Sequence, residues 1–304
     1  MEQQAENKTF KEKFGKFHDK YYRHLLLIPI IILIFSFIYL FVFYQKTGDF
    51  FNKDISLTGG TSVTIYGQID AGELKSKISG KLDEVNTREV YDLLTREKIA
   101  IIIETKSSGN LTKQILEENL GYKLTDEKSS FEFTGSNLSA NFYRQLLTAI
   151  SFSFLLMSIV VFIMFRKFVP SAAVIISAFA DILMTLVVVN IFGIKISGAG
   201  IVAFLMLIGY SVDTDILLTN RLLKRTEGTL NERTFSSFKT GMTMALTSIV
   251  TVVIGLIVSF SFSQVLSQIF TVLFIGLIFD IFNTWVTNVS LLKWYLKKGG
   301  ENEN

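Results

Sequence analysis

Six long apolar segments constrain this chain more than any other feature of its sequence. The first, residues 25–44, has no charged side chain, and about 20 such residues form a helix that crosses the roughly 30 Å hydrocarbon core of a bilayer. Comparable segments follow at residues 146–165, 170–192, 197–223, 241–260 and 266–292. Hydrophobic residues make up 49% of the chain and charged residues only 19%, below the share of about a quarter that is usual in soluble domains. We therefore expect an α-helical polytopic membrane protein with six transmembrane helices.

Lysine and arginine predict how these helices are oriented. Basic side chains concentrate in the N-terminal tail 1–24, in the loops after spans two and four, and in the C-terminal tail 293–304. The two short loops on the opposite side contain only Lys195. Because loops rich in lysine and arginine stay in the cytoplasm, we expect both termini to be cytoplasmic and the protein to be a multi-pass component of the cell membrane, that is, the inner or plasma membrane.

Residues 45–143 form the large segment outside the predicted spans. Their composition differs from that of the spans, with charges of both signs and short runs in which apolar and polar residues alternate. The pattern predicts strands at 62–68, 89–94, 98–105 and 130–134 and helices at 71–81 and 111–119, the second with Asn110 as its N-cap. This order of elements is that of the split βαβ arrangement. We therefore expect one small ferredoxin-like α+β domain on the extracytoplasmic side.

Composition excludes several kinds of chemistry. The chain has no cysteine, which excludes disulfides, cysteine-ligated metal sites and thiol nucleophiles. The formal net charge is +3, and the basic residues stand in short runs beside apolar segments, a distribution that is typical of a topology signal and not of a nucleic-acid surface. We expect membrane lipids around the protein, no nucleic-acid partner, no cofactor, no metal and no enzymatic activity.

Four carboxylates inside the predicted spans demand an explanation. Asp181 lies near the middle of span three, Asp213 and Asp215 in the cytoplasmic half of span four, and Asp280 near the middle of span six. Each would cost roughly 2.5 to 3.5 kcal/mol at the bilayer centre, so four ionised and lipid-facing carboxylates would cost as much as a typical protein gains on folding. They must face protein or water, or be protonated.

Helical spacing divides the polar residues of span four between two faces. Ser211, Asp215 and Thr219 share one face, while Asp213 points about 160° away from Asp215 and needs a different partner. Span six has its own polar stripe, formed by Gly276, Asp280, Asn283, Thr284 and Thr287. Close helix approach is permitted by Gly198, Gly200, Gly241 and Gly255. We expect a polar interior among spans three to six.

Two interpretations of these acids stay open. They are either neutral, hydrogen-bonded contacts that hold the bundle together, or members of an ion or proton pathway, for which Asp213 is the strongest candidate. Arg221 and Lys239 are candidates to pair with an ionised acid, although a basic residue at a helix end is more often a topology anchor.

The Gly59-Gly60 pair, taken alone, is typical of a turn.

Three motifs of this chain resemble those of the SecF family, whose members are the smaller partners of SecD in a branch of the RND transporter superfamily. Residues 54–61 (D-I-S-L-T-G-G-T) are similar to the signature that opens the external domain of the family. Residues 209–221 (G-Y-S-V-D-T-D-I-L-L-T-N-R) resemble its span-four motif, and residues 239–243 resemble the start of its span five. The resemblance implies structural roles for Asp54, Gly59, Gly60, Thr61, Gly209, Tyr210 and Ser211.

The span-four motif departs from the common bacterial form, which reads G-Y-S-V-N-D-T and ends in F-D-R. The bacterial aspartate aligns with Thr214, so that Asp213 and Asp215 lie on either side of it. Lys239 stands where bacterial relatives have arginine. The D-T-D pattern is similar to that of archaeal members.

The resemblance implies an accessory subunit of the Sec protein translocase. Such a subunit acts with a SecD-like subunit and the Sec translocon channel, binds translocating unfolded polypeptide and promotes its export by the flow of protons or sodium ions. Two rivals are a half-unit of an RND-type small-molecule or lipid exporter and a passive scaffold. A third, an intramembrane aspartyl protease, is disfavoured because no G-x-G-D sequence is present.

Overall fold

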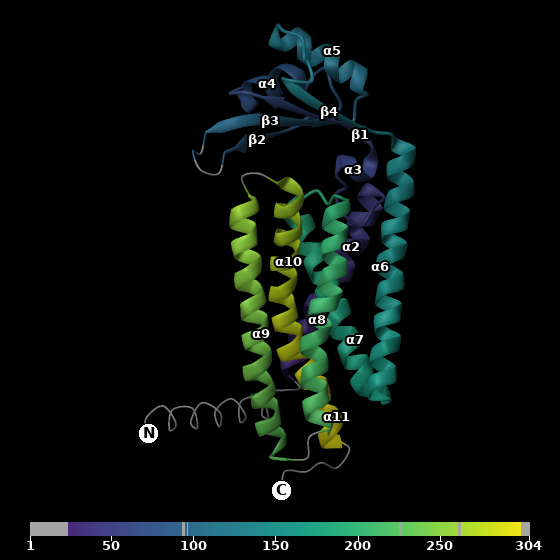
Figure 1. Ribbon diagram of the computed structural model, residues 1–304. Coiled ribbons are helices and arrows are strands. Elements are labelled where there is room, and N and C mark those ends of the chain that lie inside the picture. Colours follow the sequence, from purple (N-terminus) through teal and green to yellow (C-terminus); the bar gives the residue numbers. More distant parts are fainter. Residues whose placement is uncertain (1–23, 93–94, 96, 225–226, 261–262, 299–304) are drawn as a thin grey trace.

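The computed structural model describes residues 24–92, 95, 97–224, 227–260 and 263–298. Figure 1 shows a helical bundle with a small α/β domain above one of its ends. Six helices of the described chain are long and apolar enough to cross a membrane. They are α2 (Leu27–Thr47), α6 (Ser136–Phe165), α7 (Phe168–Ile191), α8 (Gly198–Lys224), α9 (Leu230–Ser259) and a last one built from α10 (Gln264–Phe282), the π-helix η1 (Asn283–Asn288) and α11 (Val289–Lys298). The predicted number of spans is confirmed; most of the predicted N-terminal tail lies outside the described residues.

Two helices begin about ten residues before the apolar segments that predict them. Helix α6 starts at Ser136, directly after the last strand of the external domain. Helix α9 starts at Leu230 with a capping box, in which Thr229 and Glu232 each accept a hydrogen bond from the other's backbone N–H. A hydropathy pattern marks only the apolar part of a helix that lies in the hydrocarbon core. The polar turns by which α6 and α9 extend beyond the bilayer are therefore not predicted by it.

The external domain has the predicted ferredoxin-like order of elements. These are β1 (Gly60–Tyr66), α4 (Ala71–Ile78), β2 (Asn86–Tyr91), β3 (Lys98–Thr105), α5 (Gly109–Leu120) and β4 (Ser129–Thr134). The four strands lie in the order β2-β3-β1-β4, and all three neighbouring pairs are antiparallel. The predicted N-cap at Asn110 is wrong: helix α5 starts two residues earlier, because the Ser108 carbonyl already accepts the Thr112 N–H at 2.9 Å.

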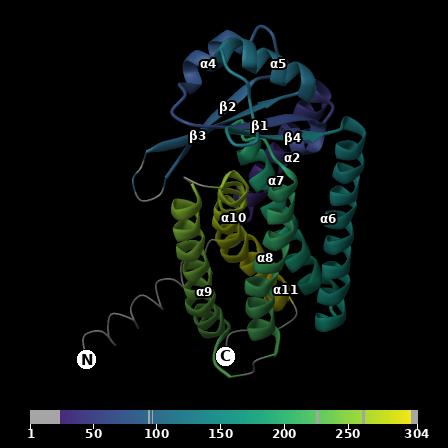
Figure 2. The ribbon, with the colours of Figure 1, turned by 45° about the horizontal axis from the view of Figure 1, so that its top comes forward.

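The two faces of the sheet differ. Helices α4 and α5 cover the face that points away from the bundle, as Figures 1 and 2 show. The residues of β1 and β3 that pack beneath them are fully buried: Val63, Ile65, Ile101 and Ile103. The opposite face is more polar and looks toward the outer ends of α8 and α10 across a cleft of about 600 Å³.

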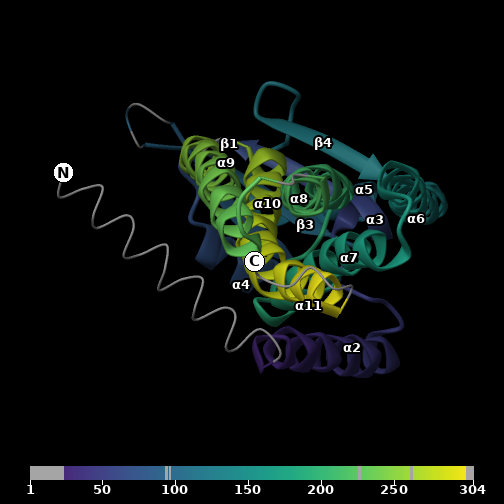
Figure 3. The same cartoon turned by 90° about the horizontal axis from the view of Figure 1, so that it is seen from below.

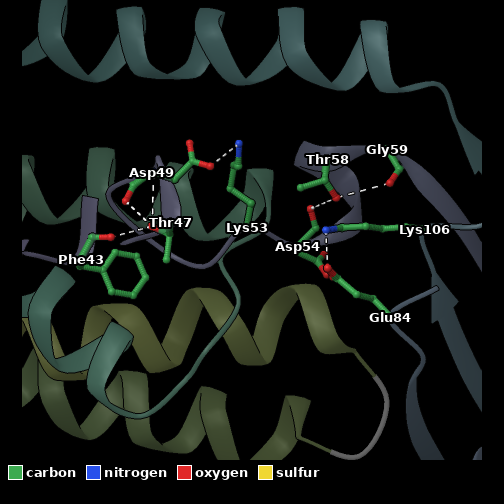
Figure 4. A network of polar contacts seen from close by, with 9 residues as sticks. All are labelled: Phe43, Thr47, Asp49, Lys53, Asp54, Thr58, Gly59, Glu84 and Lys106. Atoms are coloured by element: carbon green, nitrogen blue, oxygen red, sulfur yellow. Dashed lines mark hydrogen bonds and ion pairs between the residues drawn. The ribbon is translucent and has the colours of Figure 1, made fainter. Parts of the chain in front are cut away.

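A short segment joins α2 to the domain and ties both to the bundle (Figure 4). It contains an ion pair of 2.8 Å between Lys53 and Asp49, and the one-turn helix α3 (Ile55–Thr58), whose Thr58 hydroxyl donates to the Asp54 carbonyl. The same segment pairs with the loop between α7 and α8, because the Asp54 N–H donates to the Ile196 carbonyl at 3.0 Å.

Helix α8 lies between α9 and α10 on one side and α6 and α7 on the other, as the view along the helices in Figure 3 shows. It contacts α6, α7, α9 and α10. The predicted close approach at glycines is confirmed: a Cβ atom would lie within 3.0 Å of a neighbouring side chain at Gly198, Gly200, Gly241 and Gly255.

Candidate functional site

Three carboxyl groups from three spans lie together inside the bundle. Asp181 of α7 and Asp215 of α8 have no exposed surface, and Asp280 of α10 is 1% exposed. Each follows the spacing that the sequence predicts, since Ser211, Asp215 and Thr219 are buried on one face of α8, and most of the polar stripe of span six faces the same interior. The predicted polar interior is therefore confirmed for spans three, four and six.

Asp181 is held by one partner from each of the two neighbouring spans. The Ser211 hydroxyl of α8 donates to Oδ2 at 2.5 Å, and the Asn283 amide of η1 donates to Oδ1 at 2.7 Å. The Thr287 hydroxyl in turn donates to Asn283 Oδ1 at 3.0 Å, which fixes the orientation of that amide.

Asp215 shares one of its partners with Asp280. Its Oδ1 atom accepts from the Thr284 hydroxyl and from the Asn288 amide, both at 2.8 Å. The same Thr284 hydroxyl lies 3.3 Å from Asp280 Oδ1. Because a hydroxyl has a single proton to donate, Thr284 serves one carboxylate at a time and can accept from the other when that one is protonated.

The π-helix η1 allows one span to reach two of the acids. Asn283 binds Asp181 and Asn288 binds Asp215, although five residues separate the two asparagines. An α-helix would turn them about 140° apart, whereas i→i+5 hydrogen bonding, seen where the Val289 N–H donates to the Thr284 carbonyl, brings such residues onto one side. Asn288 was not among the predicted site residues, and the Asn-x4-Asn spacing is the only signal for it in the sequence.

Every hydrogen-bond partner described for the three carboxyl groups is neutral, either a hydroxyl or an amide. Burial of more than one ionised carboxylate in such a group would be costly, because like charges repel and no opposite charge offsets the loss of water. The cluster can therefore take up positive charge, as protons or as a small cation.

Asp213 lies outside this cluster. It is exposed on the opposite face of α8, beside Tyr210, which is 44% exposed, and Gly209, which has no atom within 4 Å of the position of a Cβ. The prediction that Asp213 and Asp215 point in opposite directions is confirmed, and it is Asp215 that the fold brings to the other acids.

The two basic candidates lie near the start of α9. The Arg221 guanidinium donates to the Ser236 carbonyl at 2.8 Å and to the Thr240 hydroxyl at 2.9 Å, so it joins α8 to α9. The Lys239 side chain is exposed. A basic residue assigned only to topology, Lys293, is instead fully buried and donates to Asn231 Oδ1 at 2.7 Å.

The motif at residues 54–61 shapes the entry into the external domain. A Cβ atom at Gly59 would lie 2.6 Å from the Ser136 Cα, and one at Gly60 would lie 2.4 Å from the Thr105 carbonyl oxygen. Both glycines also have positive φ angles, 83° and 149°. The Thr61 hydroxyl donates to the Ser107 carbonyl at 2.7 Å. Only glycine fits where β1 passes this closely under its neighbours.

The cleft beneath the sheet contains a second group of charges. Glu104 of β3 lines it with Asp54 and Arg88. Burial raises the pKa of Glu104 to about 7, and the negative charge of Asp54 adds to the rise, while Lys195 and Arg88 act in the opposite direction. Glu104 was not among the predicted site residues, because an acid in an alternating strand has the pattern of an ordinary solvent-facing residue.

Comparisons with known proteins agree with one another. The family of the C-terminal part of the protein export membrane proteins SecD and SecF matches residues 114–298. The chain is 39% identical to the protein-export membrane protein SecF of Methanocaldococcus jannaschii over 91% of its own length and 96% of that protein. It is 34% identical to the SecF of Pyrococcus furiosus, over 95% of its length and 96% of that protein.

The fold also matches a solved structure. The crystal structure of SecDF, a translocon-associated membrane protein from Thermus thermophilus, superposes with a TM-score of 0.68 at 18% identity. The match covers 92% of this chain and 38% of that longer chain. The two SecF relatives are named for protein export and not for an enzymatic reaction.

Proposed function

The chain belongs to the SecF family of protein-export membrane proteins, and from this we propose that it acts with a SecD-like subunit to drive polypeptide export by ion flow through its carboxyl cluster. An accessory role in the Sec pathway follows from family membership. The ion coupling, the partners and the roles of individual residues are the proposal.

The observation that carries the proposal is the hydrogen-bonded group of Asp181, Asp215 and Asp280. Structural acids would each need only a local donor, whereas these three come from different spans and are linked through shared or adjacent donors. Intramembrane acids of this kind belong to ion and proton pathways.

Uptake of positive charge gives the cluster two states. With an added proton or cation, two of the acids can share Thr284; without it, repulsion favours a rearrangement of α7, α8 and α10. One elementary charge that crosses 100 mV releases about 2.3 kcal/mol, so a few ions per cycle suffice to move the external domain against modest barriers.

The exposed face of α8 is the contact surface we propose for the SecD-like subunit. It presents Asp213 together with Val202, Met206, Gly209 and Tyr210. A carboxylate within a span costs too much to face lipid, so a neighbouring helix must supply a hydrogen-bond donor or a positive charge. The open space at Gly209 lets such a helix approach closely.

We place the external domain, residues 45–143, outside the cell membrane and both termini in the cytoplasm, on the distribution of lysine and arginine. In this orientation the domain meets unfolded polypeptide as it leaves the translocon channel. Motion of the bundle reaches the domain through the link between Asp54 and Ile196 and through the unbroken passage from β4 into α6.

Export into membrane vesicles that contain this chain and its SecD-like partner tests the proposal. Asp215→Asn and Asp181→Asn keep the size of each side chain but remove its charge. We expect both to abolish the part of export that an imposed ion gradient stimulates, while Asp126→Asn, an exposed acid of the external domain, leaves it intact. Gradient-stimulated export that persists in both cluster variants would refute ion coupling through these carboxyls.

A further inference from the structure

We infer that the buried side of Asp215 is a binding site for a dehydrated monovalent cation, with sodium as the best match, formed together with Asn288, Thr219 and Ser177. The inference rests on the proposed function, because it names the ion that the carboxyl cluster takes up.

Four buried oxygen atoms carry the inference, because none of them has a hydrogen-bond partner of regular geometry among the described residues. They are Asp215 Oδ2, Asn288 Oδ1, Thr219 Oγ1 and Ser177 Oγ. The Ser177 hydroxyl and the Asp215 carboxylate are close enough to interact with each other, whereas the other two oxygens have no such neighbour in the described part of the chain. The four side chains are 0% exposed. A buried polar atom without a partner is rare, since each costs on the order of 1 to 3 kcal/mol, and several in one place indicate a ligand.

The four atoms belong to side chains that lie around the Asp215 carboxyl group. Asn288 donates its amide to Asp215 Oδ1 at 2.8 Å, so both the free carboxylate oxygen and the free amide oxygen flank that hydrogen bond. Thr219 is one helical turn from Asp215 on the same buried face of α8. The Ser177 hydroxyl of α7 faces the same carboxyl group from the other side.

The two hydroxyls differ from many others in the described helices, although Ser139, Thr185 and Ser290 also lack a hydrogen-bond partner. A helical serine or threonine can donate its proton to the carbonyl four residues earlier, as Ser171, Thr234 and Ser237 do at 2.8 to 2.9 Å. Thr219 and Ser177 make no such bond. Their oxygen lone pairs are therefore available to coordinate a cation.

The chemical composition of these four groups favours a hard cation with a single positive charge. All four atoms are oxygens, which are the ligands that hard cations prefer. The set carries a single negative charge, that of Asp215, because Asn288, Thr219 and Ser177 are neutral. One carboxylate with three neutral oxygens balances one positive charge, whereas magnesium and calcium need more charge or several retained waters.

Sodium binding to the purified full-length chain in detergent tests the inference. Radioactive sodium should bind saturably to a single site, and NaCl should raise the apparent Tm above that in KCl or N-methylglucamine chloride at equal ionic strength. Thr219→Val replaces a hydroxyl without a partner by a methyl group of the same size, so the fold should survive. Loss of one oxygen ligand should weaken sodium binding about tenfold.

Thr234→Val is the matched control, because Thr234 is equally buried in α9 but its hydroxyl is bonded to the Leu230 carbonyl. It should leave the affinity for sodium unchanged. A wild-type chain that shows no saturable sodium binding and the same Tm in all three salts would overturn the inference, with water in the site instead. An equal loss of affinity in Thr219→Val and Thr234→Val would also overturn it.

Export separates this inference from the proposed function. If Asp215→Asn abolishes gradient-stimulated export but sodium neither binds nor drives it, the carboxyl cluster works with protons and only the sodium site is refuted. If sodium binds selectively but Asp215→Asn leaves export unchanged, the site is supported and the proposed coupling is refuted.

Discussion

Replacement of Glu104 should make the docking of the external domain insensitive to pH. The Glu104 side chain lies in the cleft between the sheet and the bundle, where burial and Asp54 raise its pKa from 4.5 to about 7. The folded protein therefore binds more protons than the unfolded chain between these two values. Its stability should fall as the pH rises from about 4.5 to about 7 and be level above that.

The size of the effect follows from the shift of the pKa. Each unit corresponds to about 1.36 kcal/mol, so ionisation of Glu104 should cost the folded state about 3 kcal/mol at most. Glu104→Gln keeps the shape of the side chain and removes this cost. At pH 8 the variant should therefore be more stable than the wild type by up to that amount.

Hydrogen exchange of the β3 amides in the full chain, reconstituted in lipid nanodiscs and measured from pH 5 to pH 8, reports the local stability. After correction for intrinsic exchange rates, protection in the wild type should fall by up to about two orders of magnitude across this range, and Glu104→Gln should abolish the fall. Glu132→Gln, an exposed acid that lines the same cleft, is the control. Parallel pH profiles for the wild type and Glu104→Gln would refute the argument.

Three further predictions concern packing and the acid cluster. Gly60→Ala would place a Cβ 2.4 Å from a β3 carbonyl oxygen at a φ of 149°. The external domain should therefore lose about 2 kcal/mol or more of stability, measured as faster proteolysis. The control Gly80→Ala, which adds a Cβ in open space, should not change the rate of proteolysis. Gly241→Val would place a side chain against Trp285, whose ring lies 2.6 Å from the Cβ position. Such overpacking costs about 1 to 3 kcal/mol, so the Tm of the isolated chain should fall. An unchanged Tm would contradict the close contact between Gly241 of α9 and Trp285 of η1. Ser211→Ala removes a donor 2.5 Å from the Asp181 carboxylate and should cost about 1.5 to 3 kcal/mol in thermal unfolding, more than Ser237→Ala, whose buried hydroxyl serves only a backbone carbonyl. Equal losses of stability in Ser211→Ala and Ser237→Ala would contradict the strong hydrogen bond between Ser211 and the Asp181 carboxylate.

Local features of the sequence determined much of the architecture. The thickness of a bilayer sets the length of an apolar span, and alternation sets the buried face of a strand, so both can be read over a few residues. The six spans, the order of strands and helices in the external domain, and the opposite directions of Asp213 and Asp215 all follow from such local rules.

Other features depend on residues far apart in the chain. Asp215 meets Thr284 and Asn288 across 69 and 73 positions, and Asp181 meets Asn283 across 102. No periodicity within one helix indicates which neighbour it will contact. For this reason Asp213 looked like the strongest candidate from the sequence, while the fold brings Asp215 to the other acids.

The sequence by itself determined that this chain spans a membrane six times, has one ferredoxin-like domain and carries acids where they are costly. Only the tertiary structure decided which acids share partners, that η1 winds as a π-helix to reach two of them, and that Glu104 is enclosed beneath the sheet. The physical reason is that hydropathy and periodicity act along one segment, whereas desolvation and hydrogen bonding of a buried group depend on every segment packed around it.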